Sequence, residues 1–564
     1  MSLRPRQRLG DLLAGIAATT THAAIDDIVV QGLSLDSRKL RAGDAFVALR
    51  GGSTHGIAFA PAAAAQGACV ILSEAPAPAA FHADAGRDST APPAGGRRWR
   101  EAPAEAVEAH DHSVSTSRAD MPREESDENR VPDDRVSKIG TTGANEDPAE
   151  PARVPVVWID GLRERLGEIA ARFFGNPSQA LEVIGVTGTN GKTSVVQLLA
   201  RALQQLGARA ATVGTLGAGP VGAIRAGERT TPDVINVQAL LAEFRDAGTS
   251  HVAMEVSSHA LEQGRVNAVR FDVAAFTNLT RDHLDYHGTM RSYAAAKARL
   301  FAWPGLRAAV INIDDDFGRE LASSLPVGVQ ALTFGIDNAL ADIRATDVRS
   351  DTDGMRFALV TPWGSATIAT SLLGRFNVAN LLAVAGCLGA LACPFAEIEA
   401  ALRHAQPVVG RMNRLGGGEL PLIVVDYAHT PDALEQALTS LRAHSHARLI
   451  CVFGCGGERD QGKRPQMATI AERLADAVIV TDDNPRGENG DEIVAQIVMG
   501  FRHPEAVRIE RDRARAIATA LREARAGDVV LIAGKGHEPY QEVAGIRYPF
   551  DDLDVARRAL QAAA

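Results

Sequence analysis

The segment Thr-Gly-Thr-Asn-Gly-Lys-Thr-Ser at residues 187–194 carries residue types that bind phosphate. It follows an apolar run, 181–186, and precedes apolar residues at helical spacing, so we expect a glycine-rich turn between a strand and a helix. Backbone N–H groups and the helix N-terminus would face an anion there. Lys192 would add a full charge, and the Thr193 hydroxyl would hold Mg²⁺. Val186 replaces the first glycine of the general Gly-x-x-x-x-Gly-Lys-Ser/Thr pattern, which makes this variant a narrower signal for a nucleotide site.

Acidic residues and histidines follow two further predicted strands. The strand at 251–255 ends in Glu255, whose carboxylate could hold Mg²⁺ against the phosphates. The strand at 273–276 leads into a segment with His283 and His287 beside aspartates. A histidine pair beside acids favours a metal or phosphate contact over a purely structural role.

Four apolar runs near the C-terminus each end in a polar or glycine-bearing cluster. The runs predict strands of a second α/β sheet, and ligands of such sheets bind beyond the carboxyl ends of the strands. Four chemically rich clusters at four strand ends therefore predict a second binding site. The clusters are Asp426 to His429, Gly454 to Asp460, Asp483 to Arg486 and Gly534 to Glu538.

Composition and charge describe an ordinary globular chain of 564 residues. The net charge of −10 argues against nucleic acid as the main partner, and no run reaches membrane-spanning length. Five cysteines show no zinc spacing and indicate reduced thiols in the cytoplasm. We therefore expect a cytoplasmic monomer that binds small molecules, with no nucleic-acid or membrane partner.

The pattern of strands and helices predicts an α/β protein of three domains. These are an N-terminal domain at 1–180, a central parallel-sheet domain with the phosphate loop at 181–408, and a C-terminal Rossmann-like domain at 409–564. From 75 to 152 the chain is rich in alanine, proline and charged residues and poor in large apolar ones, which predicts a disordered insertion. Apolar runs on both sides of it predict that it interrupts one domain rather than separating two.

Eleven segments, in order along nearly the whole chain, resemble motifs of the Mur ligases, ATP-dependent enzymes that add amino acids to peptidoglycan precursors. The segments are Leu35 to Arg38, Thr187 to Ser194, Thr230 to Asp233, Met254 to His259, Arg281 to His287, Tyr293 to Lys297, Asn377 to Asn380, Asp426 to His429, Gly454 to Asp460, Asp483 to Arg486 and Gly534 to Glu538. The resemblance is to the branch that adds meso-2,6-diaminopimelate to the UDP-N-acetylmuramoyl dipeptide. One departure is Gly-Arg-Met-Asn at 410–413, where the family often ends in glutamate.

The resemblance implies site residues for each ligand. Lys192, His283 and Lys297 would be catalytic. ATP would contact Gly188, Thr189, Asn190, Gly191, Lys192, Thr193, Ser194, Asn377, Asn380 and Asp426. The UDP-linked substrate would contact Leu35, Ser37, Arg38, Thr230, Thr231, Ser257, Gln263 and Arg265. Diaminopimelate would contact Arg459, Asp483, Asn484, Pro485, Arg486, Gly534 and Glu538. Mg²⁺ would be bound by Thr193, Glu255, His283 and Lys297, the last as a carbamate.

For Lys297 the residues alone and the resemblance lead to different expectations. Its helix-forming neighbours predict an ordinary solvent-facing lysine. The resemblance implies instead that CO₂ carbamylates Lys297 and so replaces a cation with a carboxylate that can bind Mg²⁺. Carbamylation needs a neutral amine, which burial or nearby positive charge would favour.

The implied reaction is amide ligation in two steps. The γ-carboxylate of the D-glutamyl residue attacks the ATP γ-phosphate, and the amine of the amino acid then attacks the resulting acyl phosphate. The first step brings an anion toward a polyanion, so Lys192 and Mg²⁺ would be needed to cancel repulsion. Because an acyl phosphate hydrolyses readily, domain closure is expected to exclude water.

Arg486 is expected to determine which amino acid the enzyme adds. Diaminopimelate has a second carboxylate that lysine lacks, and a guanidinium fork binds a carboxylate in bidentate fashion. Lysine would leave that guanidinium unpaired. The site could therefore discriminate against lysine by a factor of as much as ~10⁴ in kcat/KM. Asp483 and Glu538 could bind the distal ammonium, and Arg459 is a second carboxylate candidate. An interdomain salt bridge is the alternative role for Arg486.

The sequence leaves three alternative functions. A lysine-adding ligase would be disfavoured by Arg486. A folylpolyglutamate synthase-like ligase would share the central domain but would not account for Leu35 to Arg38 or Asp483 to Arg486. A regulatory P-loop ATPase would turn ATP over without an amino-acid substrate.

Overall fold

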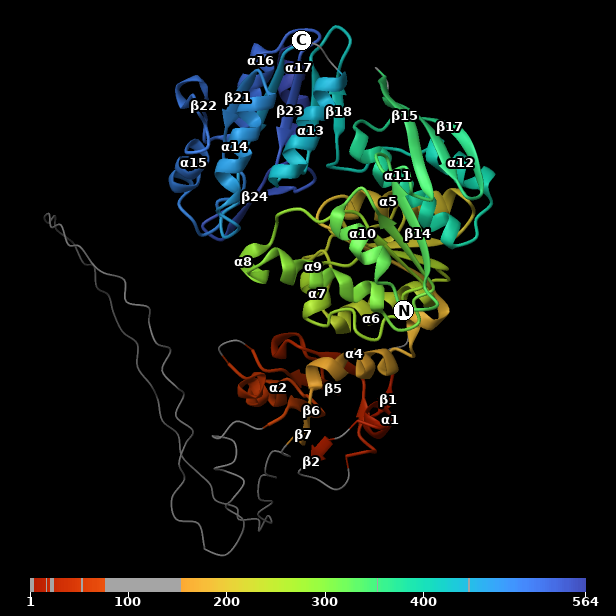
Figure 1. Cartoon of the computed structure of the whole chain (residues 1–564). Helices are drawn as coiled ribbons and strands as arrows, with labels where there is room; N and C mark the ends of the chain where they lie inside the picture. Colours follow the sequence, from red (N-terminus) through yellow and green to blue (C-terminus); the bar gives the residue numbers. More distant parts are fainter. Residues whose placement is uncertain are drawn as a thin grey trace, which may run out of the picture. The chain divides into compact units, whose positions relative to one another are not determined.

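The computed structural model describes residues 5–16, 18–20, 25–51, 54–76, 154–351, 354–444 and 447–563. Three large sheets with packed helices form the fold of these residues (Figure 1). The predicted insertion at 75–152 falls almost wholly outside them. None of the helices in the described ranges is both long and apolar enough to cross a bilayer.

The N-terminal sheet has the strand order β2-β7-β6-β5-β4. Strands β4 to β7 run parallel and β2 is antiparallel to β7. β6 and β7 lie on either side of the long undescribed segment, yet they pair directly, with Ile71 opposite Val156. Both flanks of that segment therefore belong to one sheet. The elements are β1 Gln7–Arg8, α1 Leu9–Leu13, β2 Ala18–Thr20, β3 Val29–Val30, β4 Gly32–Ser34, η1 Ser37–Lys39, β5 Asp44–Ala48, η2 Gly56–Phe59, α2 Ala60–Ala65, β6 Val70–Glu74, β7 Val156–Ile159, α4 Leu162–Phe173 and η3 Pro177–Ala180.

The central sheet has the order β10-β9-β11-β8-β12-β13-β14-β15-β16-β17. All pairs from β9 to β15 are parallel, as predicted. The edges are antiparallel, because short connections join β9 to β10 and β15 to β17 and leave no room for crossovers. The strands are β8 Glu182–Thr187, β9 Ala210–Gly214, β10 Gly217–Pro220, β11 His251–Glu255, β12 Val273–Phe276, β13 Ala308–Asn312, β14 Gln330–Gly335, β15 Ile343–Asp351, β16 Gly354–Thr361 and β17 Gly364–Thr370.

Helices cover both faces of the central sheet. Alternate strand residues point to opposite faces, so Ile184 packs with α5, α11 and α12, whereas Val183 packs with α6, α7 and α10. The carboxyl ends of β8, β11 and β12 therefore meet at one edge between the helix layers. The helices are α5 Lys192–Gln205, α6 Val234–Asp246, α7 Ser258–Glu262, α8 Leu284–His287, α9 Met290–Ala298, η4 Arg299–Ala302, α10 Asp316–Ser323, α11 Arg375–Ala390 and α12 Phe395–Arg403.

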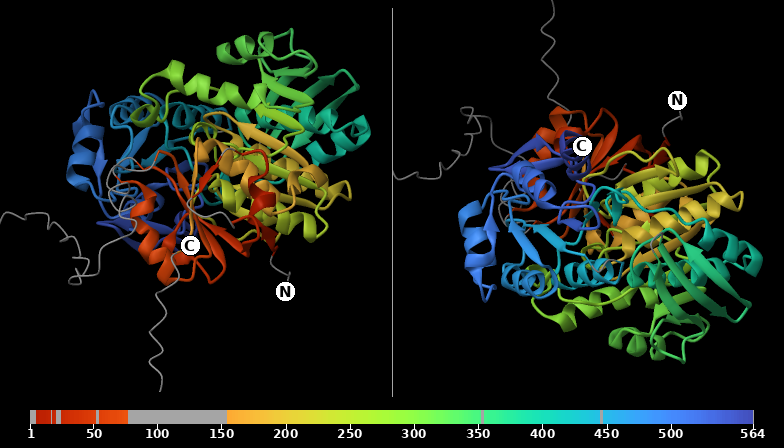
Figure 2. Two further views of the ribbon diagram at one scale, coloured as in Figure 1. Left: turned by 90° about the horizontal axis from the view of Figure 1, so that it is seen from below. Right: turned by 90° about the horizontal axis from the view of Figure 1, so that it is seen from above.

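The C-terminal sheet has the order β18-β19-β23-β20-β21-β22, parallel except for β18. Helices α13 to α15 pack on one face, and α16 and α17 on the other (Figures 1 and 2). A separate hairpin, β24–β25, follows the last parallel strand. The elements are β18 Asn413–Gly416, β19 Leu422–Asp426, α13 Pro431–His444, β20 Leu449–Phe453, α14 Lys463–Leu474, β21 Ala477–Val480, α15 Gly490–Val498, η5 Pro504–Ala506, β22 Arg508–Ile509, α16 Arg513–Glu523, β23 Val529–Ala533, β24 Tyr540–Val543, β25 Ile546–Pro549 and α17 Asp552–Ala563.

A buried ion pair fixes the carboxyl end of β23. The Arg513 guanidinium contacts both carboxylate oxygens of Asp552 at 2.7 Å, and both side chains are fully buried. Arg513 Nη2 also donates to the Ala533 carbonyl (3.0 Å), the last residue before the predicted cluster at Gly534. Removing one member would leave the other charged and unpaired in the interior, which is strongly destabilising.

We expect Arg513→Met to lower the stability of the C-terminal domain by about 3–5 kcal/mol, because Asp552 would lose its buried partner. Urea unfolding of the full chain measures this as a lower midpoint for that domain's transition. Arg515→Met is the matched control on the exposed side of α16 and should change stability by less than about 0.5 kcal/mol. Equal midpoints for the two variants would contradict the role given to the pair.

Candidate active site

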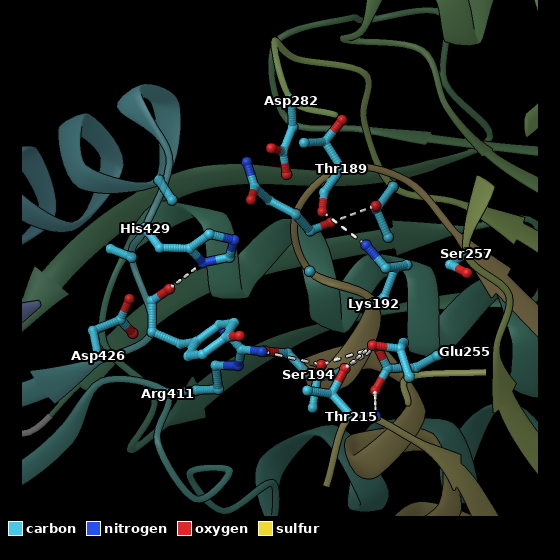
Figure 3. Close-up of a pocket in the computed structure, with 18 of the residues that line it drawn as sticks. Thr189, Lys192, Ser194, Thr215, Glu255, Ser257, Asp282, Arg411, Asp426 and His429 are labelled. Carbon is cyan, nitrogen blue, oxygen red and sulfur yellow. Dashed lines mark hydrogen bonds between the residues drawn. The ribbon is translucent and has the colours of Figure 1, made fainter. Parts of the chain in front are cut away.

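The phosphate loop joins β8 to α5 and lines a cleft of about 1330 Å³ (Figure 3). The Lys192 ammonium turns back over the loop and donates hydrogen bonds to the carbonyls of Gly188 (2.9 Å) and Thr189 (2.8 Å). Here the helix dipole and free backbone N–H groups of α5 also favour an anion. Pockets for one small molecule usually measure about 300–1,000 Å³, so this cleft has room for more than one ligand.

Two glycines let the loop pass close to its neighbours. Gly188 has φ of 147°, and a Cβ there would overlap the Thr277 hydroxyl. Thr277 uses this hydroxyl to donate to the Asn190 carbonyl (2.6 Å). Gly191 has φ of 86°, and its Cβ would lie 2.6 Å from Asn380 Oδ1. Both backbone conformations and both close approaches favour glycine.

Glu255 forms the base of the site at the end of β11. It is only 1 % exposed and forms no ion pair with a described residue. Its carboxylate accepts hydrogen bonds from Thr193 Oγ1 (3.1 Å), Thr215 N (2.8 Å) and Thr215 Oγ1 (3.1 Å), as Figure 3 shows. A buried carboxylate among hydroxyl groups offers the oxygen ligands that Mg²⁺ prefers.

The possible metal ligands at the loop suit a cation that is bound by only a few protein atoms. The described ranges contain no cluster of three or more His, Cys, Asp or Glu residues that could enclose a metal ion. Mg²⁺ is commonly bound by one or two protein oxygens, with water and phosphate as the other ligands. The Thr193 hydroxyl and the Glu255 carboxylate fit that arrangement.

His283 lies at the N-terminus of α8 and lines the cleft. Its ring centroid is 4.8 Å from that of His259 and 6.1 Å from that of Tyr293. Burial lowers the pKa of His283, so its imidazole is neutral at pH 7 and keeps a lone pair for a metal or a proton. His287 has a structural partner instead, since its Nε2 lies 2.9 Å from Ser258 Oγ.

Lys297 does not face solvent, so the expectation from its helix-forming neighbours is wrong. The residue is 1 % exposed, its Nζ donates to the Gly188 carbonyl (2.7 Å), and it lies 4.3 Å from the centre of the Tyr293 ring. Tyr293 and Lys297 are four residues apart and share the face of α9 that packs inward. Burial, followed by the charge of Lys192, moves the pKa of Lys297 well below its ordinary value.

Four of the residues predicted to hold the UDP-linked substrate line the cleft: Thr230, Thr231, Ser257 and Arg265. Thr231 Oγ1 donates to the last carbonyl of β11 (2.8 Å), and Ser257 N donates to Thr231 Oγ1 (3.2 Å). Gln263 is not among the residues that line the cleft, but its Oε1 accepts from Arg265 Nε (2.9 Å). The row is therefore continuous with the phosphate loop.

Leu35 and Ser37 are not part of the cleft. They lie at the end of β4 and the start of η1 in the N-terminal sheet domain. Asp36 between them caps η1, and its Oδ1 accepts from both Arg38 N and Arg38 Nε at 3.0 Å. The structure does not bring these residues together with the phosphate loop.

Side chains from all four C-terminal clusters line the same cleft as the phosphate loop, among them those of Asp426, Arg459, Asp483 and Glu538, and Gly534 contributes its backbone. Asp426 Oδ2 also accepts from Met412 N (2.8 Å), so this carboxylate anchors the turn at the start of the domain. Arg459 is exposed at the rim.

Arg486 also lines the cleft, with a backbone φ of 53° that is unusual for a residue with a side chain. Its Nη1 donates to the Gly457 carbonyl (2.8 Å). Within the described residues it forms no ion pair, so the structure does not support the alternative of an interdomain salt bridge.

Three predicted contact residues lie just beneath the cleft surface: Asn377, Asn484 and Pro485. Asn377 donates to the Leu373 carbonyl (2.8 Å) and accepts from Asn380 Nδ2 (3.0 Å), so it orients Asn380, which does reach the cleft. Asn484 donates to Glu538 Oε2 (2.7 Å) and so holds another cleft residue.

Arg411 and Lys463 are among the cations that line the cleft and were not predicted from the sequence. Arg411 Nη2 donates to Thr193 Oγ1 (3.1 Å), its guanidinium lies 4.4 Å from the centre of the Tyr427 ring, and its buried Nε has no partner among the described residues. Lys463 is buried at the first position of α14. A lysine at a helix N-terminus opposes the helix dipole, and this was a usable signal in the sequence.

Comparisons with known proteins agree on one family. Residues 29–174 match the family described as Mur ligase family, catalytic domain. Residues 186–388 match the Mur ligase middle domain, and 410–536 match the Mur ligase, glutamate ligase domain.

Individual relatives match over nearly the whole chain. A UDP-N-acetylmuramoyl-L-alanyl-D-glutamate–2,6-diaminopimelate ligase of Xanthomonas campestris pv. campestris (strain 8004) is 53% identical over 95% of this chain and 94% of its own. The ligase of the same name from Pseudomonas aeruginosa PAO1 is 47% identical over 95% of this chain and 96% of its own. A solved structure with that name has a TM-score of 0.62 at 33% identity and covers 98% of this chain and 99% of its own.

We expect Gly188→Ala to reduce affinity for ATP at least about 100-fold, because a methyl group would push Thr277 away from the loop and strain a positive φ. Titration with a fluorescent ATP analogue measures this. Gly207→Ala is the control, since Gly207 also has a positive φ but has open space around it at the end of α5. Equal affinities of the two variants would show that the close approach at Gly188 is unimportant.

Proposed function

Since this chain belongs to the Mur ligase family, we propose that its cleft is the site where ATP, a UDP-linked dipeptide and an amino acid react. The chain is an ATP-dependent, ADP-forming ligase that adds meso-2,6-diaminopimelate to UDP-N-acetylmuramoyl-L-alanyl-D-glutamate in peptidoglycan precursor synthesis. The observation that carries the assignment of the site is that the phosphate loop and the Asp483 to Arg486 cluster line one cleft.

ATP binds with its phosphates over the loop at 188–194. Lys192 leaves the carbonyls that it now contacts and moves to the phosphates, while Arg411 adds a second cation beside Thr193. We assign Asn380 and Asp426, which both line the cleft, to the nucleoside, with Asn377 orienting Asn380. Concentrated positive charge is what this step needs, because a carboxylate must approach a triphosphate.

Chemistry starts with attack of the D-glutamyl γ-carboxylate on the γ-phosphorus of ATP. A bond forms between carboxylate oxygen and phosphorus, the bond to the bridging oxygen breaks, and ADP leaves. We assign the dipeptide end of the substrate to four residues that line the cleft: Thr230, Thr231, Ser257 and Arg265. The uridine end belongs at Leu35, Ser37 and Arg38 of the N-terminal domain.

Mg²⁺ would bind at Thr193, Glu255 and His283, where it neutralises phosphate charge when bound. The protein's own part is to hold these ligands ready for the ion. Burial keeps His283 neutral, and the hydroxyl groups of Thr193 and Thr215 orient the Glu255 carboxylate.

Lys297 becomes a carbamate in this proposal. Its neutral amine forms a bond to the carbon of CO₂ and loses one proton, which converts a buried amine into a buried anion near the loop. The low pKa of Lys297 supports this step, because only the unprotonated amine reacts.

The second step makes the amide bond. The amine of diaminopimelate attacks the acyl carbon, the bond to the phosphate oxygen breaks, and inorganic phosphate and a proton leave. Arg486 binds the distal carboxylate, and Asp483 and Glu538 lie where an ammonium would be held. This chemistry needs ATP and a nucleotide-linked sugar, so we propose a cytoplasmic location, and one chain supplies the whole cleft, so we propose a monomer.

An amino-acid panel tests the assignment. The wild-type chain, supplied with ATP and UDP-N-acetylmuramoyl-L-alanyl-D-glutamate, should form tripeptide, ADP and phosphate with meso-diaminopimelate and at least about 100-fold less product with L-lysine. Oxygen-18 in the γ-carboxylate should appear in the released phosphate. Phosphate release that ignores the amino acid would favour a regulatory ATPase instead.

In the same assay we expect Arg486→Ala to raise KM for meso-diaminopimelate about 100-fold, because two charged hydrogen bonds are lost, and to leave KM for ATP within about threefold. Arg502→Ala, at an exposed position of the same domain, is the control. Equal small effects of Arg486→Ala on both KM values would remove Arg486 from the amino-acid site.

We expect the carbamate on Lys297 to give a ¹³C resonance when the protein is supplied with ¹³C-bicarbonate. Because the pKa of this amine is lowered, the signal and the ligase rate should persist at neutral pH and fall together as the pH drops through that lowered pKa. Lys297→Met should lack the signal and lose about 10³-fold in kcat, whereas the exposed Lys39→Met should keep both. A rate that survives without the signal would refute the modification.

A further inference from the structure

A buried lysine stands behind the amino-acid end of the cleft. Lys535 has a fully buried side chain and does not line the cleft itself. Its Nζ donates to Asn484 Oδ1 (3.1 Å), to Glu538 Oε2 (3.2 Å) and to the Tyr540 carbonyl. An ammonium has three N–H donors, so each has an acceptor here and none remains for a ligand.

These contacts fix the orientation of the Asn484 amide. Its Oδ1 accepts from Lys535 and from Glu542 N (2.9 Å), and both of these groups can only donate. The amide cannot flip without losing both hydrogen bonds. Asn484 Nδ2 is therefore held toward Glu538 Oε2, which it contacts at 2.7 Å.

The same contacts give the two oxygens of the Glu538 carboxylate different roles. Oε2 accepts from Lys535 and Asn484 and is turned into the protein. Among the residues that the structure describes, Oε1 has only a long contact of 3.4 Å with the Tyr427 hydroxyl. Since Glu538 lines the cleft, Oε1 is the oxygen left to accept a hydrogen bond from a ligand's ammonium group.

Lys535 also sets the charge around this end of the cleft. Arg486 contributes one positive charge, and Asp483 and Glu538 contribute two negative charges. The Asp483 carboxylate lies against the backbone of Gly534, next to Lys535 in the chain, so these charges belong to one site. Arg459 also lines the cleft, so the part of Lys535 is to offset the charge of Glu538, whose Oε2 lies 3.2 Å from its Nζ. Loss of Lys535 would make this end of the cleft more negative by one charge, which favours a lone ammonium over an end that carries both an ammonium and a carboxylate.

We propose that Lys535 is a positioning residue for amino-acid selectivity. It holds Asn484 and Glu538 in one orientation and offsets the charge of Glu538, so the site accepts the zwitterionic end of diaminopimelate and disfavours the single ammonium of lysine. This inference rests on the proposed function of the cleft and adds a second determinant to Arg486.

The test compares kcat/KM for meso-diaminopimelate and for L-lysine in four full-length proteins: wild type, K535M, E538Q and the double variant. K535M should lower the ratio of the two values at least tenfold, because the site becomes more negative by one charge. E538Q should raise the ratio, because the site loses one negative charge and lysine has only its ammonium to offer. The double variant restores the net charge of the wild type, and its ratio should return to within about threefold of wild type.

A purely structural role for Lys535 would lower both kcat/KM values equally and would raise KM for ATP, and that result would overturn the proposal. If K535M does not fold, E538Q still tests the charge argument. An unchanged or lowered ratio of kcat/KM for meso-diaminopimelate to kcat/KM for L-lysine in E538Q would contradict that argument. Failure of the proposed function would be visible separately, as wild-type protein that ligates neither amino acid.

Discussion

Moving a carboxylate up to a triphosphate is opposed by charge repulsion, and the cleft is organised around this difficulty. The carboxyl ends of β8, β11 and β12 bring the phosphate loop, Glu255 and the His283 segment to one edge of the central sheet. Lys192 and Arg411 then add positive charge from the loop and from the C-terminal domain. Parallel strands make this possible, because their ends gather groups that are far apart in sequence.

Much of this arrangement could be predicted from the sequence, because it depends on local patterns. The strand, glycine turn and helix at 181–205 show their periods directly, and so do the four C-terminal runs with their polar ends. The antiparallel edges of the central sheet could not be predicted in this way, since they follow from connection length and pairing rather than from the composition of any one strand.

The tertiary neighbours of Lys297 and Arg411 could not be predicted from local sequence patterns. The burial of Lys297 depends on α9 packing beside α7 and the loop, and nothing in the helix itself reveals those neighbours. The segment 410–413 differs from the family pattern at Asn413, and nothing in the segment itself indicates a role for Arg411. The contact of Arg411 with Thr193 joins residues 218 positions apart, and only the folded structure supplies it.

The pairing of β6 with β7 has a practical consequence. Residues within the strands set their register, with Ile71 opposite Val156. A parallel pair of strands requires a connection of only about a dozen residues or more. The far longer natural connection therefore offers a place where a fluorescent reporter or an affinity tag could be exchanged for native residues. The inserted reporter or tag would be attached to the N-terminal sheet and would leave the residues that line the cleft unchanged.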